Sequence, residues 1–104
     1  MKHWTFNDIV NWHKETFQNC TLDSQKKKFC EEYIEYLESK DPEELADLCL
    51  VGLVLSGRYG FVGCDQIAWQ ELNQIDINYW IDKKMEKNSK RTWIFVDGVY
   101  RHED

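Results

Sequence analysis

The chain has 104 residues and a formal net charge of −6, from 19 acidic and 13 basic side chains. Its length fits a single domain, residues 1–104. The acidic balance argues against a protein that wraps nucleic acid, since such proteins need a basic face.

The N-terminus carries Trp4, Phe6 and Ile9 among polar residues, unlike the apolar run of a signal peptide. No stretch reaches the roughly 18 apolar residues that a membrane span needs. The cysteines form no C-x-x-C pair and match no zinc-site spacing; they are Cys20, Cys30, Cys49 and Cys64. We therefore expect a cytoplasmic protein with reduced thiols and neither a membrane nor a nucleic acid partner.

Helical signals begin at once. Thr5 and Asp8 have the spacing of a capping box and predict a first helix from near Thr5 to near Gln18. Thr21 is a suitable cap for a second helix, and residues 39–41, Ser-Lys-Asp, indicate the turn that follows it.

A third helix is predicted from Pro42 to about Ser56. Asp41 provides its cap and Pro42 its first residue, a strong helix start. From Leu45 to Leu55 the segment is apolar on every side except for Asp47, so we expect this helix to be largely buried.

A fourth helix is predicted from about Asp65 to about Lys90. Residues 93–101 then predict a short hairpin with an Asp-Gly turn, which should lie on the helices or on a partner subunit. The sequence thus favours an all-α fold, an antiparallel four-helix bundle that assembles into an oligomer, with a C-terminal hairpin or extended tail.

Acidic residues occupy one side of the second helix. Glu31, Glu35 and Glu38 lie largely opposite the apolar side, and Glu32 lies at its border; the apolar side comprises Leu22, Phe29, Tyr33, Tyr36 and Leu37. Taken alone, this pattern is typical of a solvated acidic face.

The third helix adds Asp47, the one charged group in its apolar run, with Glu44 one turn earlier. An antiparallel pairing of the two helices brings Glu32, Glu35, Glu44 and Asp47 within about one and a half turns of each other. Carboxylates in so small a space need cations, and oxygen ligands suit Mg²⁺ or Mn²⁺. The alternative for Asp47 is a buried salt bridge to Arg58 or Lys84.

A basic group follows on the fourth helix. Lys84, Asn88 and Arg91 are spaced i, i+4, i+7, which predicts one face that can hold phosphate oxygens. The alternative is a solvated helix end whose cations favour the C-terminal dipole.

These residues together resemble the MazG-like, all-α nucleotide pyrophosphohydrolase superfamily, which carries E-x-x-E on one helix and E-x-x-D on the next. Here the motifs read Glu32-Tyr33-Ile34-Glu35 and Glu44-Leu45-Ala46-Asp47. The remaining segments look like the small phage and bacterial dATP/dGTP diphosphohydrolase-type members, at residues 12–17, 21–28, 84–93 and 97–102. The likeness covers nearly the whole chain, although only eight residues separate Glu35 from Glu44, fewer than the family usually has.

The resemblance implies an enzyme that cleaves ribo- or deoxyribonucleoside triphosphates to monophosphate and pyrophosphate, by attack of water on the α-phosphorus. Mg²⁺, or Mn²⁺, would be held by Glu32, Glu35, Glu44 and Asp47. Glu31 or Glu35 would activate the water, and the choice between them stays open.

The substrate would be held by groups after and before these acids. Lys84, Asn88 and Arg91 would bind the β- and γ-phosphates. Trp12, Phe17 and Trp93 are candidates to stack on the base, with Trp69 and Trp80 as weaker ones.

The breadth of apolar surface on the third and fourth helices predicts a homodimer or homotetramer. A catalytically inactive helical oligomerisation or interaction protein on the same scaffold is the alternative function, and a metal-independent melting temperature would favour it.

Overall fold

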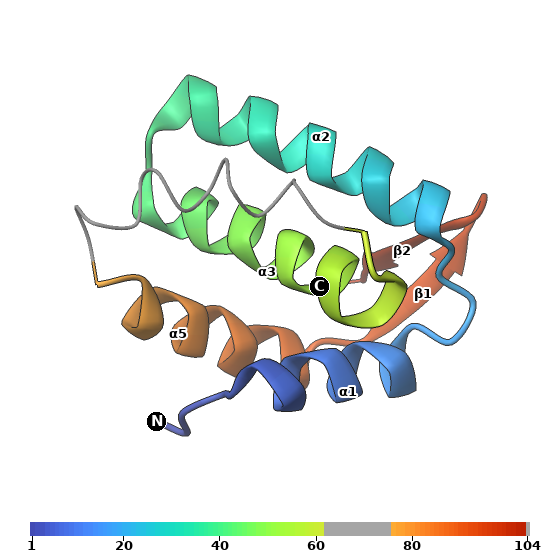
Figure 1. Cartoon of the computed structure of the whole chain (residues 1–104), viewed down its shortest axis with the longest axis horizontal. Coiled ribbons are helices and arrows are strands. Elements are labelled where there is room, and N and C mark those ends of the chain that lie inside the picture. The colour runs from blue at the N-terminus through green and yellow to red at the C-terminus, as the bar shows by residue number, and fades with distance from the viewer. Residues whose placement is uncertain (62–75, 104) are drawn as a thin grey trace.

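The computed structural model describes residues 1–61 and 76–103. This part of the chain is mostly helical and ends in a short antiparallel hairpin (Figure 1). Its elements are α1 (Phe6–Thr16), α2 (Leu22–Ser39), α3 (Pro42–Tyr59), α5 (Ile77–Lys90), β1 (Trp93–Val96) and β2 (Val99–His102).

Helix α3 is the centre of the fold, and α1, α2 and α5 all pack against it (Figure 1). Leu45, Leu48 and Leu55 of α3 are almost completely buried, and Met85 of α5 joins them. The predicted burial of the third helix is confirmed. Its apolar residues face several neighbours at once, which is why no amphipathic stripe is needed.

Local signals at the helix ends act as predicted. Thr5 and Asp8 form a reciprocal capping box at α1. Asp41 caps α3 with Pro42 in the first turn, and the left-handed Lys40 (φ 55°) ends α2 directly before it. The second and third helices are therefore joined by a very short turn, which brings their adjoining ends together.

The prediction of one long fourth helix is wrong at Asp76. This residue is non-helical (φ −80°, ψ 82°), and its side chain accepts a hydrogen bond from the Tyr79 backbone N–H. A side chain that satisfies this N–H competes with helical continuation, so α5 begins at Ile77. The predicted stretch from Asp65 to residue 75 lies outside the described residues.

The predicted hairpin is confirmed. Asp97 and Gly98 both have positive φ, 53° and 79°, as a two-residue turn between right-twisted strands requires. Trp93 pairs with His102 across the two strands. The Asn19 backbone N–H donates to the Tyr100 hydroxyl at 3.2 Å, so the hairpin lies against the α1–α2 connection.

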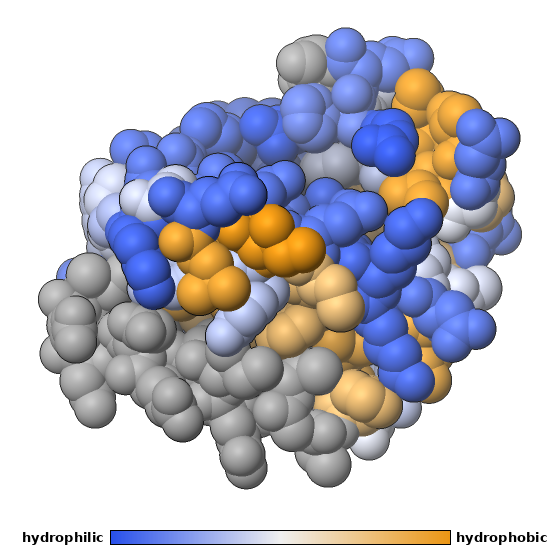
Figure 2. All heavy atoms as spheres, turned by 90° about the horizontal axis from the view of Figure 1, so that it is seen from above, coloured by the Kyte–Doolittle hydropathy of each residue, from blue (hydrophilic) through white to orange (hydrophobic). Residues whose placement is uncertain are grey.

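The outer side of α2 differs from prediction. Leu37, expected on the apolar side, is 47% exposed, and Ile34 is also exposed. The buried residues of α2 are instead Gln25, Phe29, Glu32 and Tyr36. The buried face therefore includes the polar Gln25 and the acidic Glu32 but not Leu37. Seen from above, apolar side chains interrupt a largely hydrophilic surface (Figure 2).

Candidate functional site

Carboxylates from α2 and α3 meet where the two helices pack. One ligand oxygen each from Glu32, Glu35 and Glu44 lie within 4.8 Å of one another. Glu32 and Glu35 share a face because they are three residues apart on α2, and the short turn brings Glu44 beside them. Such a triad of oxygens has the composition of a site for a hard divalent cation.

Asp47 stands apart from this triad because it is held by a lysine. Its Oδ2 lies 3.1 Å from the Lys84 Nζ, so the salt bridge considered as an alternative to metal binding is formed with Lys84. The other proposed partner, Arg58, instead contacts His13 and the Phe17 carbonyl. Burial raises the pKa of Asp47, and the charge of Lys84 opposes that rise.

Among the carboxylates of the site, Glu32 is the most deeply buried and has the most strongly raised pKa. It is only 6% exposed, and its Oε1 lies 3.0 Å from the Lys28 Nζ. Its Oε2 is buried and receives no hydrogen bond within residues 1–61 and 76–103. Burial raises the pKa of Glu32 to about 7, against the opposing effect of Lys28.

Glu44 also has a raised pKa and a buried carboxylate oxygen. Its Oε2 is also buried and has no hydrogen-bond partner among the described residues. Burial raises its pKa, and the nearby charges of Asp47 and Glu35 raise it further. Buried carboxylate oxygens in this state need a proton or a cation.

The basic group stands at the end of α5 and just beyond it. Lys84 and Asn88 are helical, whereas Arg91 is the extended residue that ends α5, a difference from the predicted three-residue helical face. Arg91 Nη1 donates to the Asn88 Oδ1 at 3.2 Å. The amide therefore orients the guanidinium even though the helix has ended.

Aromatic rings form another wall, assembled from α1 and the hairpin. Phe17 is central: its ring centroid lies 5.2 Å from Trp12, 5.0 Å from Trp93 and 4.8 Å from Tyr100. Phe17 is buried, which makes it a support, while the other three are only half-buried. Tyr100 was missed in the sequence, since nothing local connects it to residue 17.

Behind this wall lies a polar contact that the sequence did not predict. Arg58 Nη1 lies 2.9 Å from the His13 Nδ1 and donates to the Phe17 carbonyl at 2.9 Å. Burial, and then the charge of Arg58, lowers the pKa of His13 to about 3. His13 is thus a neutral acceptor, and Arg58 satisfies the C-terminal end of α1.

The carboxylates, the basic group and the aromatic wall all border one cavity of about 520 Å³, whereas Arg58 lies outside its lining. The sequence-predicted site residues among its lining are Trp12, Phe17, Glu31, Glu32, Glu35, Glu44, Asp47, Lys84, Asn88, Arg91 and Trp93. Glu38 and Trp80 do not line it, and Trp80 packs against Tyr79 instead. Trp69 lies outside the described residues.

No protein-family model, no curated protein and no solved structure matches this chain. None of the helices described here is long and apolar enough to cross a lipid bilayer. Cys20, Cys30 and Cys49 are free thiols, and Cys64 lies outside the described residues.

Proposed function

We propose that this protein is a Mg²⁺-dependent nucleoside triphosphate pyrophosphohydrolase of the MazG-like kind. The observation that carries the proposal is the pair of buried carboxylate oxygens, one on Glu32 and one on Glu44, that no described group hydrogen-bonds. Both residues contribute to the triad with Glu35. Mg²⁺ or Mn²⁺ would supply the partner that these oxygens need, with Asp47 as a further ligand.

The rest of the cavity lining supports a nucleotide as the substrate. A bound cation would offset the triphosphate charge and lower the pKa of an attacking water. Lys84, Asn88 and Arg91 would receive the β- and γ-phosphate oxygens, as a point charge, a neutral donor and a planar fork. Metal ligands, phosphate donors and stacking rings border the same 520 Å³ space, a volume suited to a small ligand.

Water activation falls to an acidic side chain at the cavity edge. Glu31 and Glu35 are both exposed on α2 and both line the cavity, so either is accessible to a water beside the triad. The carboxylate would orient this water, or accept its proton, as it attacks the α-phosphorus. The products would be a nucleoside monophosphate and pyrophosphate.

Product analysis tests the proposal. The purified protein is incubated with each ribo- and deoxyribonucleoside triphosphate and Mg²⁺ in water labelled with heavy oxygen. We expect monophosphate and pyrophosphate, with the label in the monophosphate and no turnover after chelation. Release of diphosphate and orthophosphate, or turnover that survives chelation, would refute the proposed reaction.

The second candidate is a helical interaction protein on the same scaffold. It is favoured by the ion pairs Lys28–Glu32 and Lys84–Asp47, which offset part of the acidic charge without metal. The exposed Ile34 and Leu37 of α2 would suit a partner. A melting temperature that ignores Mg²⁺ and Mn²⁺, together with no hydrolysis, would select this function.

In either case the helices would form an antiparallel bundle that assembles as a cytoplasmic homodimer or homotetramer. The exposed apolar residues of α2 support self-association. Light scattering at micromolar concentration tests it, and a stable monomer would contradict it.

A further inference from the structure

We infer that Lys84 competes with a divalent cation for Asp47, and that the phosphates of the substrate relieve this competition by drawing Lys84 away. Lys84 would then couple metal binding to nucleotide binding. This inference rests on the proposed function and adds a way in which the same site is regulated.

The first observation is the position of the Lys84 ammonium between two carboxylates. Its Nζ lies 3.1 Å from the Asp47 Oδ2 and 3.6 Å from the Glu43 Oε1. The Lys84 side chain is 12% exposed and that of Asp47 is 23% exposed. Because water screens charges at this half-buried position only partly, the Lys84 ammonium would repel a divalent cation bound at Asp47 strongly.

The second observation is that Lys84 lies beside the other two residues that we propose to bind phosphate. Lys84, Asn88 and Arg91 all line the cavity, and Lys84 lies one helical turn before Asn88. A lysine has a flexible four-carbon stem and a compact charge that changes partners readily. The ammonium can therefore move from Asp47 to a phosphate oxygen without movement of α5.

The third observation is that Glu43 forms a second ion pair, with Lys87, in addition to that with Lys84. Lys87 lies closer to the same Glu43 oxygen, at 3.0 Å, and neither Glu43 nor Lys87 lines the cavity. When Lys84 moves, Glu43 keeps a cation, whereas Asp47 is left for the metal. The arrangement thus frees one carboxylate selectively, the one on the cavity side.

The test is Mn²⁺ binding to Lys84→Gln, measured by calorimetry without nucleotide and then with a non-hydrolysable nucleoside triphosphate. Without nucleotide, we expect the variant to bind Mn²⁺ about five- to tenfold more tightly than the wild type, since a repelling charge is gone. The nucleotide should tighten Mn²⁺ binding strongly in the wild type and much less in the variant. Lys90→Gln is the matched control, because Lys90 pairs with Glu86 and lies outside the cavity lining, and it should leave both affinities unchanged.

Circular dichroism establishes that each variant is folded, and Lys84→Met repeats the test with a side chain that cannot hydrogen-bond Asp47. If the wild type binds Mn²⁺ and both Lys84 variants bind it no more tightly, the competition is refuted while the proposed function stands. If no protein binds Mn²⁺ with or without nucleotide, both the inference and the proposed function fail.

Discussion

The carboxylate wall and the aromatic wall of the cavity are built in opposite ways. The carboxylate wall comes from residues 31–47, on two helices joined by one short turn. The aromatic wall joins residues 12–17 of the first helical segment to residues 93–102 of the hairpin, which are distant in the sequence. One wall is a local structure, and the other exists only after the chain has folded.

The two walls also differ in what they contribute to stability. Trp12 and Trp93 pack edge to face against Phe17, an arrangement that stabilises the fold. Glu32 and Glu44 instead bury carboxylate oxygens that no described group hydrogen-bonds, which costs stability. Changes in the carboxylate wall should therefore remove activity and leave the fold intact, whereas changes in the aromatic wall should affect both.

The largest expected effect is on Asp47→Asn. Loss of a charged ligand should lower kcat by about a hundredfold or more, because it weakens the hold on the metal that activates water. Circular dichroism should show an unchanged helical spectrum. Glu38→Gln, on α2 but outside the cavity lining, is the control and should retain activity. Equal activity in both variants would remove Asp47 from the site.

Glu32→Gln should stabilise the metal-free protein at high pH. The folded pKa of Glu32, about 7, exceeds its ordinary 4.5, so its destabilising effect is absent below about pH 4.5, grows as pH rises from 4.5 to 7, and is complete above 7. The variant should exceed the wild type by about 2–3 kcal/mol at pH 8 and match it near pH 4. Urea unfolding in the presence of a chelator measures this difference. If the stabilities of the two proteins changed with pH in parallel, the charge of Glu32 would not destabilise the fold.

Arg91→Ala should weaken nucleotide binding with little effect on metal. A charged hydrogen bond to phosphate contributes about 1.5–3 kcal/mol, which predicts a KM at least roughly tenfold higher. Mn²⁺ affinity without nucleotide should change less than twofold, by the order of magnitude of screened charges at this range. A KM that does not move would place Arg91 outside the phosphate site.

Trp12→Leu should separate base binding from phosphate binding. Loss of one stacking ring should raise KM for nucleoside triphosphates about five- to tenfold. Binding of inorganic triphosphate, which has no base, should be unchanged. The melting temperature should also fall, because Trp12 packs against Phe17. Equal loss for both ligands would mean that Trp12 serves the fold alone.

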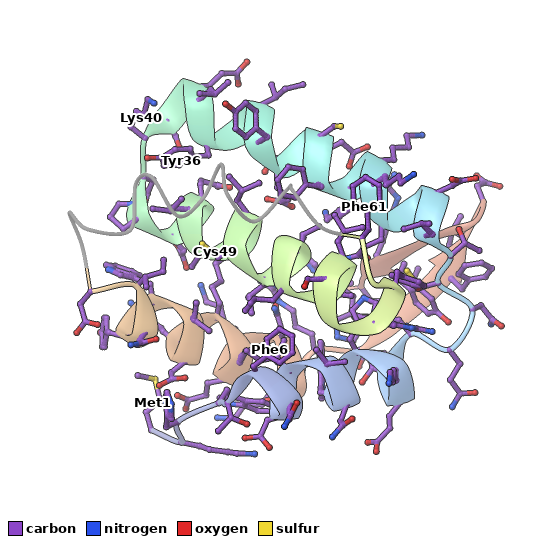
Figure 3. All side chains as sticks on the ribbon, viewed as in Figure 1. Met1, Phe6, Tyr36, Lys40, Cys49 and Phe61 are labelled. Carbon is purple, nitrogen blue, oxygen red and sulfur yellow. The ribbon has the colours of Figure 1, made fainter. Side chains whose placement is uncertain are left out.

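Gly57→Ala should have the smallest effect, on the way α1 sits against α3. A Cβ at this position would lie 2.5 Å from the Val10 Cγ2 and 2.7 Å from the Phe6 Cζ, where Phe6 projects toward α3 (Figure 3). The neighbouring side chains would have to shift to relieve this crowding, which destabilises the fold, whereas alanine favours the helix more than glycine does. The net loss in the free energy of unfolding should be about 1 kcal/mol. Calorimetric melting measures it, and Val10→Ala in the same chain should recover part of the loss. A more stable single variant would show that the two helices have room to part.

Local chemistry explains what could be predicted. The Thr5 and Asp8 capping box, the Asp41-Pro42 helix start and the Asp97-Gly98 turn each act within a few residues, so the sequence shows them directly. One error arose where a competing contact decided the outcome, since the Asp76 side chain caps α5 at a point where the predicted helix continues. A second error concerns Leu37, which lies on the solvent side of α2.

By itself, the sequence determined which acids can meet. The helical period places Glu32 and Glu35 on one face, and the short turn after α2 limits how far Glu44 can lie from them. Only the tertiary structure decided that Lys84, and not Arg58, pairs with Asp47, and that Tyr100 joins Phe17. The physical reason is that periodicity orients a side chain around its own helix, whereas packing selects the neighbour that covers it.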